Sequence, residues 1–369
     1  MRVKFWGVRG SLPSPLTPVE MASRSIELLK AFCDSLFKAN FLEQSPPVDL
    51  VQVQKAAEAF VADQVGALGL GLANESSQSV WSEYQGSRFF GYGGNTTCIE
   101  VKSSAKAQGQ SIGGKVENLI IDGGSGIRLL GYDLMKGAYG KGMGEVHILM
   151  THFHWDHLMG LPFFTPLFIK GNKIHFHAVQ PELEQVIRSV FRKPYFPLNF
   201  EDLAADIFFH PLTPRQVNQF GDFKVSPYQL DHPDPCWGFL IESEGKRFSH
   251  CVDTECTRVT RDELGLDLPL YQNVDLMIFD AQYTLMEAIE KVNWGHAAAT
   301  LGIDIALREN IKKVIFMHHD PASSDKKISQ ALDQAKRYHQ TQLKSAKREG
   351  VSIFDVNWMY AHEGLELEV

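Results

Sequence analysis

The chain has 369 residues and a formal net charge of −8, and 44% of its residues are hydrophobic. This hydrophobic content is sufficient for a substantial buried core, so the composition excludes a disordered protein. No segment approaches the roughly 20 consecutive apolar residues of a membrane span, and the negative charge gives no overall attraction to nucleic acid. Five cysteines without C-x-x-C spacing indicate neither a disulfide framework nor a zinc knuckle. We expect a soluble, unprocessed cytoplasmic protein.

The pattern of apolar residues predicts strand-rich blocks interrupted by helices. Apolar and polar residues alternate over residues 2–7, which predicts a strand. In residues 17–72, apolar residues recur at helical spacing in two runs separated by Pro46 and Pro47, which predicts a helical hairpin. Further strands are predicted at 98–103, 117–122, 145–150, 173–179, 222–230, 237–243 and 314–317, and helices at 181–191, 295–310 and 326–350. This order predicts two sheets covered by helices.

The stretch THFHWDHLMG, residues 151–160, places three histidines and an aspartate within six positions. It follows the apolar run VHILM, which predicts a loop directly after a buried strand. Because side chains alternate along an extended segment, His152 and His154 should point to the same side of the chain. A turn after them should then place Asp156 and His157 at a second point nearby. Imidazole and carboxylate ligands suit zinc, and also manganese or iron, and a hydrolytic site keeps one position open for water. The motif predicts a loop that two adjacent metal ions can share.

With this H-x-H-x-D-H motif the sequence resembles the metallo-β-lactamase superfamily. It looks most like the phosphodiesterase branch, which includes tRNase Z and the phosphoribosyl cyclic phosphodiesterases. The likeness is carried, in the order of that branch, by WGVRGSLPSP, YGGNTTCIEV, LIIDGGSGIR, THFHWDHLMGLPFF, LDHPDPCWGF, CVDTE, FDAQYT, WGHAAAT and FMHHDP. The resemblance implies an α+β fold, an αββα sandwich with metals at one edge of the paired sheets. Residues 1–369 are then one domain, with a helical insertion at 16–87 that the resemblance does not cover.

The resemblance also implies a ligand set for two divalent ions, expected to be zinc, with manganese or iron as alternatives. The first ion would be bound by His152, His154 and His232, the second by Asp156, His157 and His318, and Asp253 would bridge both. From its own context alone, His232 is more typical of a loop residue among prolines than of a ligand, and Asp253 is as readily a turn or helix-capping residue as a ligand. In MHHDP the first histidine, His318, is the assigned ligand, and His319 remains the alternative.

Further residues are assigned by the same resemblance. Asp122 in IIDGGSG would orient a metal-bound histidine rather than bind metal; an ordinary turn aspartate is the alternative. His296 in WGHAAAT matches the G-H-S-T of the branch, where the histidine faces the substrate phosphate, so it would stabilise the transition state or protonate the leaving group. A solvent-exposed histidine at a helix start is the alternative. Asp280 in FDAQYT aligns with the glutamate of the tRNase Z motif H-E-A-T. The catalytic candidates are therefore His296, Asp156 and Asp280.

Two other histidines, His175 and His177 in KIHFHAV, also show H-x-H spacing. The sequence offers them no nearby carboxylate, and nothing in the family matches them. We therefore interpret them as ordinary strand residues. His250, close to Asp253, is expected to pack in the core or to support a metal ligand.

Two ions about 3.5 to 4 Å apart lower the pKa of a bridging water and hold both ends of an in-line displacement at phosphorus. We therefore expect phosphodiester hydrolysis. Phe279 replaces the histidine of H-E-A-T, and residues 16–87 carry four basic and nine acidic residues, whereas an RNA-binding arm should be basic. Both features favour a small substrate, such as a cyclic nucleotide or another cyclic phosphate, over a nucleic acid polymer.

The insertion at 16–87 is then expected to form a lid over the substrate or a homodimer contact. Three alternatives remain for the function of the chain. They are a carboxyl-ester, lactone or thioester hydrolase of the same fold, a tRNA 3′-processing endonuclease, and a metal-binding protein without hydrolytic activity.

Overall fold

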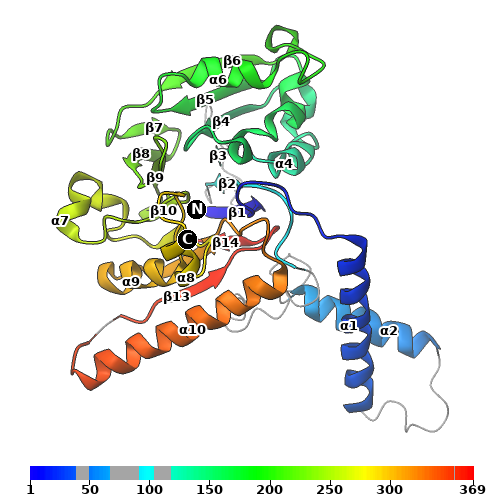
Figure 1. The fold of residues 1–369 in the computed structure, drawn as a ribbon. Helices are drawn as coiled ribbons and strands as arrows, with labels where there is room; N and C mark the ends of the chain where they lie inside the picture. Colours follow the sequence, from blue (N-terminus) through cyan, green and yellow to red (C-terminus); the bar gives the residue numbers. More distant parts are fainter. Residues whose placement is uncertain (39–49, 67–90, 104–117, 353) are drawn as a thin grey trace.

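The computed structural model describes residues 1–38, 50–66, 91–103, 118–352 and 354–369. In these residues the strands form two seven-stranded sheets (Figure 1). The first sheet consists, in spatial order, of β14 (Glu366–Glu368), β1 (Arg2–Gly7), β2 (Cys98–Lys102), β3 (Asn118–Ile121), β4 (Glu145–Leu149), β5 (Lys173–Ala178) and β6 (Asp206–Pro211). The second consists of β13 (Asn357–Tyr360), β12 (Lys313–Met317), β11 (Leu276–Asp280), β10 (Lys246–Cys251), β9 (Trp237–Ser243), β8 (Phe223–Gln229) and β7 (Asn218–Phe220).

Each sheet is antiparallel on one side and parallel on the other. Strands β3 to β6 of the first sheet and β10 to β13 of the second pair in parallel. Parallel neighbours need a crossover connection, and most of the described helices lie in these crossovers. They are α4 (Ile127–Leu134), α5 (Trp155–Leu158), α6 (Leu183–Val190), α7 (Arg261–Leu264), α8 (Leu285–Glu290), α9 (Ala299–Glu309) and α10 (Asp325–Arg348). The carboxyl ends of the parallel strands therefore lie together at one edge of each sheet.

Short 3₁₀ helices complete these connections. They are η3 (Ala138–Lys141), η4 (Leu161–Phe163), η5 (Thr165–Phe168), η6 (Phe200–Asp202) and η7 (Gly265–Leu270). One of them, η6, begins with a capping box, in which Asn199 and Asp202 exchange side-chain to backbone hydrogen bonds. Such caps satisfy backbone groups that a single helical turn leaves without partners.

Three apolar layers hold the molecule together. Between the sheets, Phe5 and Ile121 of the first sheet pack with Phe239 and Ile278 of the second, and all four are fully buried. A second core lies between the outer face of the first sheet and helices α4 and α6. A third lies between the outer face of the second sheet and helices α9 and α10. The predicted αββα sandwich is confirmed.

The segment predicted as a helical hairpin contains α1 (Pro18–Lys38) and α2 (Leu50–Gly66), which extend away from the sandwich (Figure 1). The rings of Phe32 and Phe60 contact each other across the pair, with centroids 5.6 Å apart. Arg24 on α1 forms an ion pair with Asp325 at the start of α10, which attaches the pair to the body. The boundaries 16–87 remain a prediction, because part of that range lies outside the described residues. None of the described helices has the length and apolar character needed to cross a membrane.

Candidate metal centre

The candidate site lies at the edge of the sandwich where strands from both sheets end. The loop 151–157 follows β4, and Asp122 follows β3 in the same sheet. From the second sheet, Asp253 follows β10, Asp280 ends β11 and His318 follows β12. Open parallel sheets bind ligands outside the carboxyl ends of their strands. The two sheets thus present polar side chains toward one another at a shared edge.

Three of these strand ends have left-handed backbone conformations. The φ angles are 62° at Asp122, 63° at Asp253 and 70° at His318. Non-glycine residues rarely adopt this region, and holding one there costs on the order of 1–3 kcal/mol. Such outliers cluster at functional sites, and here each one ends a strand and turns an ionisable side chain toward the same edge.

The first group of donors consists of His152, His154 and His232, whose ligand atoms lie within 4.8 Å of one another. Each imidazole has one nitrogen near a fixed partner. His152 Nδ1 lies 3.1 Å from the hydroxyl of Thr151. His154 Nε2 donates to Asp234 Oδ2 at 2.7 Å, and His232 Nδ1 lies 3.1 Å from the carbonyl oxygen of Asp234. The second nitrogen of each ring remains available for an ion.

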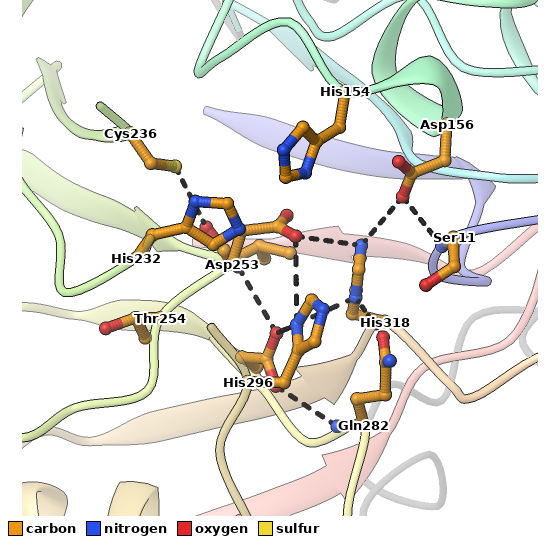
Figure 2. Close-up of polar contacts among 12 residues, drawn as sticks. Ser11, His154, Asp156, His232, Cys236, Asp253, Thr254, Gln282, His296 and His318 are labelled. Atoms are coloured by element: carbon orange, nitrogen blue, oxygen red, sulfur yellow. Dashed lines mark hydrogen bonds and ion pairs between the residues drawn. The ribbon is translucent and has the colours of Figure 1, made fainter. Parts of the chain in front are cut away.

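The second group consists of Asp156, His157, Asp253 and His318, which are all buried and also have ligand atoms within 4.8 Å of one another. His157 Nε2 lies 3.0 Å from Asp253 Oδ2 and 3.3 Å from Asp156 Oδ2. His318 Nε2 lies 3.1 Å from Asp156 Oδ2 and 3.3 Å from Asp253 Oδ1. Figure 2 shows the Asp253 carboxylate between the rings of His232 and His318. Four donors therefore converge on one buried point next to the first group.

Neighbouring residues hold the histidines of the second group in orientation. His157 Nδ1 donates to Asp122 Oδ2 at 2.8 Å, and Asp122 lies outside both groups, in the place expected of an orienting residue. His318 Nδ1 donates to Gln282 Oε1 at 2.8 Å. Hydrogen bonds of this kind fix the tautomer and direct the other nitrogen, Nε2, toward a metal.

Two residues of this support were not singled out from the sequence. Gln282 lies in FDAQYT, and Ser11, whose backbone N–H donates to Asp156 Oδ2 at 2.8 Å, lies in WGVRGSLPSP. Both segments carry the family resemblance, and that resemblance is the sequence signal from which these two residues could be found. Neither residue is titratable, so a search for ionisable side chains passes over them.

The donor set fits a divalent cation. Among the described residues, the buried atom His152 Nε2 has no hydrogen-bond partner, and the buried atoms His157 Nε2 and Asp253 Oδ2 face each other at 3.0 Å without forming a hydrogen bond. Leaving a buried polar group unsatisfied costs about 1–3 kcal/mol, so three of them at one point favour a bound ion. Burial lowers the pKa of His152 well below its usual value and keeps that imidazole neutral. Burial also acts to lower the pKa of His318, but the carboxylates of Asp253 and Asp156 raise it to about 9, and the same field favours a cation.

His296 and Asp280 form a buried pair beside the second group, and Figure 2 shows His296 next to His318. His296 Nδ1 donates to Asp280 Oδ2 at 3.0 Å, and its ring stacks on His318 with centroids 4.9 Å apart. The other oxygen, Asp280 Oδ1, accepts from the backbone N–H of Ala297 at 2.9 Å and of Gln282 at 3.1 Å. Asp280 is therefore a positioning residue for His296, and the His296 side chain is directed to the site rather than to solvent.

The structure also shows the positions of the histidines whose roles the sequence left open. His318 lies in the second group, whereas His319 donates from Nε2 to the carbonyl oxygen of Ala361 at 2.8 Å. His175 and His177 lie in β5 as expected. The expectation that they have no nearby carboxylate is wrong, because His175 Nε2 lies 3.1 Å from Glu145 Oε1. Glu145 belongs to the neighbouring strand β4, so the contact depends on strand pairing rather than on sequence proximity.

Paired sheets with histidines and carboxylates at their shared edge define a metallo-β-lactamase fold, which implies divalent metal binding. Residues 118–319, more than half of the chain, match the family described as the beta-lactamase superfamily domain. The chain belongs to the beta-lactamase superfamily. The resemblance predicted from the sequence is thereby confirmed.

Curated relatives match over shorter stretches. Ribonuclease BN of Cronobacter sakazakii is 31% identical over 109 residues, which is 27% of this chain and 32% of the relative. Ribonuclease Z of Thermococcus kodakarensis is 29% identical over 110 residues, 27% of this chain and 31% of the relative. The chain thus spans about a third of the length of these relatives. Ribonuclease Z of Metallosphaera sedula matches 52% of this chain and 75% of its own length at 21% identity.

Solved structures share the fold over more of the chain. The short form of human tRNase Z superposes with a TM-score of 0.52 and 15% identity, covering 100% of this chain and 99% of that one. Yeast PDE1 gives a TM-score of 0.53 at 15% identity, covering 74% and 95%. At such identities the likeness establishes the fold alone.

Proposed function

We propose that this protein is a dinuclear metal-dependent phosphodiesterase, with two zinc ions held by the seven residues of the two donor groups. The observation that carries the proposal is that the groups adjoin: the rings of His152 and His157, one from each group, have centroids 4.2 Å apart. Bound ions would supply Lewis acidity and an activated water for attack on phosphorus. Asp253, which lies among histidines of both groups, is assigned as the shared ligand.

The proton required by the leaving group is assigned to His296. Asp280 accepts from His296 Nδ1, which leaves Nε2 to carry a proton to the departing oxygen. The stacking of His296 on His318 keeps this nitrogen beside the second group. Asp156 acts as a metal ligand, with its carboxylate fixed by the backbone N–H of Ser11.

We assign a small cyclic phosphate, such as a cyclic nucleotide, as the substrate class. The relatives named ribonuclease Z support phosphodiester chemistry, but the sequence of the segment 16–87 is net acidic, whereas an RNA-binding segment is expected to be basic. On α1 the side chains of Val19 and Leu29 are 75% and 61% exposed, which fits a contact with a second copy of the chain. All five cysteines are free thiols, which fits a reducing cytoplasm.

The test is a substrate panel with metal-stripped protein reloaded with Zn²⁺ or Mn²⁺. The panel contains bis-p-nitrophenyl phosphate, cyclic mononucleotides, a precursor tRNA, a lactone and a thioester. We expect hydrolysis of the phosphodiesters only after reloading, with a cyclic nucleotide preferred over the tRNA. Faster hydrolysis of the lactone or the thioester would overturn the proposed chemistry, and cleavage of the tRNA alone would overturn the substrate class.

A further inference from the structure

A second set of histidines lies on the inner face of the first sheet, away from the strand ends. We call His147 of β4, His175 and His177 of β5, and His210 of β6 the imidazole ladder. His147 is the register partner of His175, and His177 is the partner of His210. Because side chains alternate along strands, these four point to one face. Phe220 of β7 in the other sheet covers part of the ladder, with its ring centroid 5.1 Å from His147 and 4.7 Å from His177.

The ladder is connected through specific nitrogen atoms. His147 Nδ1 lies 2.9 Å from His177 Nε2, and His175 Nδ1 lies 3.0 Å from His210 Nε2. His147 and His175 therefore each have Nδ1 engaged by another imidazole, and each has Nε2 left for a further partner. For His175 that nitrogen lies 3.1 Å from Glu145 Oε1. A ring whose Nδ1 is held and whose Nε2 points at a common place is the arrangement found in metal-binding histidines.

Three residues at the solvent-exposed end of the imidazole ladder lie close enough together to bind one ion. Glu145, His147 and His175 offer ligand atoms that all lie within 4.8 Å of one another. The Glu145 side chain is 51% exposed, so solvent ions reach this point. Deeper in the ladder His177 is 3% exposed, and among the described residues its Nδ1 has no hydrogen-bond partner. Ring packing alone would be served better by apolar side chains at a position so deeply buried.

The donor types of this cluster suit a cation. His147 and His175 each offer an imidazole nitrogen, and Glu145 offers a carboxylate oxygen. Two imidazoles and one carboxylate form a donor set typical of zinc, and also of copper and nickel.

We propose that Glu145, His147 and His175 bind a further divalent transition-metal ion, of the zinc class, with His177 and His210 orienting the ligands. This site shares no residue with the candidate centre at the strand ends. Its ligands lie on the neighbouring strands β4 and β5, so a bound ion connects these strands and stabilises the fold, and it is not required for hydrolysis.

The test compares the wild-type chain with a variant carrying Glu145→Gln and His175→Gln. After removal of metal by a chelator, each protein is equilibrated with Zn²⁺, and bound zinc is counted by elemental analysis. We expect the variant to bind one ion fewer per chain, to lose part of the rise in melting temperature that Zn²⁺ gives, and to keep its rate on bis-p-nitrophenyl phosphate. The single variant Glu145→Gln changes only a half-exposed side chain, so it remains informative if the double variant folds poorly.

Two further variants make the result specific. His339→Gln alters a buried histidine that contacts Asp355 at 3.4 Å and belongs to none of the donor groups, so zinc content should not change. His210→Gln removes an orienting imidazole and should weaken the site about 10- to 100-fold in zinc affinity. Equal zinc content in the wild type and the Glu145→Gln, His175→Gln variant would overturn the proposal. An equal loss of zinc in His339→Gln would overturn it as well.

Discussion

Replacing His296 by alanine is the sharpest test of the proposed mechanism. The ring donates to Asp280 Oδ2 at 3.0 Å and stacks on His318 at 4.9 Å, and it belongs to none of the seven assigned ligands. General acid catalysis contributes about 10² to 10⁴ in rate. At 1.36 kcal/mol per tenfold change, His296→Ala should therefore raise the activation barrier by about 2.7 to 5.4 kcal/mol on a substrate whose leaving group needs a proton.

The choice of substrate separates the two roles that His296 could have. A sugar alkoxide from a cyclic nucleotide is a poor leaving group, whereas p-nitrophenolate departs without a proton. The rate of His296→Ala should fall by the full factor with the cyclic nucleotide and by much less with bis-p-nitrophenyl phosphate. Equal losses on both substrates would refute proton donation and indicate stabilisation of charge on the phosphoryl group.

Metal content and folding are the controls in this experiment. In the variant, Asp280 Oδ1 still accepts from the backbone N–H groups of Ala297 and Gln282. Asp280 Oδ2 loses the His296 donor at 3.0 Å but keeps the backbone N–H of Asp253 at 3.3 Å, so this buried acceptor is not left without a partner. The protein should therefore stay folded and keep both ions. Unchanged rates on both substrates would show that His296 has no part in the reaction.

Asp253→Ala should weaken both ions together, because its carboxylate lies among ligands of both groups; elemental analysis that finds full metal content would refute the bridging assignment. Gly10→Ala should reduce metal affinity and activity without changing any ligand, since an added Cβ would overlap the side chains of His318 and Gln282, and an unchanged metal affinity measured by competition with a chelator would contradict this. Deletion of residues 19–72 should change the oligomeric state in sedimentation or the preference among substrates; a folded deletion protein that alters neither would exclude both roles for the insertion.

Local sequence patterns were sufficient to predict a large part of the candidate metal centre. H-x-H-x-D-H is a contiguous motif, so the two halves of the loop 151–157 could be assigned from spacing and strand context alone. Asp253 and His318 depend on strand ends that lie far apart in the sequence, and only the family order joined them to the loop. The block pattern of strands and helices predicted two sheets covered by helices, and the family resemblance supplied the αββα sandwich.

Contacts that depend on strand pairing could not be read from the sequence. Glu145 lies far along the chain from His175, and only the parallel register of β4 and β5 brings their side chains together. Short strands such as β7 and β14 were not predicted either, because three residues give no measurable periodicity. Gln282 was missed for another reason: its role depends on a hydrogen bond to a histidine that follows a different strand.

Each donor group at the candidate centre takes residues from both halves of the sandwich. His152 and His154 come from the first sheet and His232 from the second, and the second group is divided in the same way. An ion held there crosslinks the two sheets, so separation of the sheets and release of the ions form one thermodynamically linked equilibrium. Chelators should therefore lower the concentration of denaturant at which the whole domain unfolds, and neither half of the chain expressed alone would retain either ion.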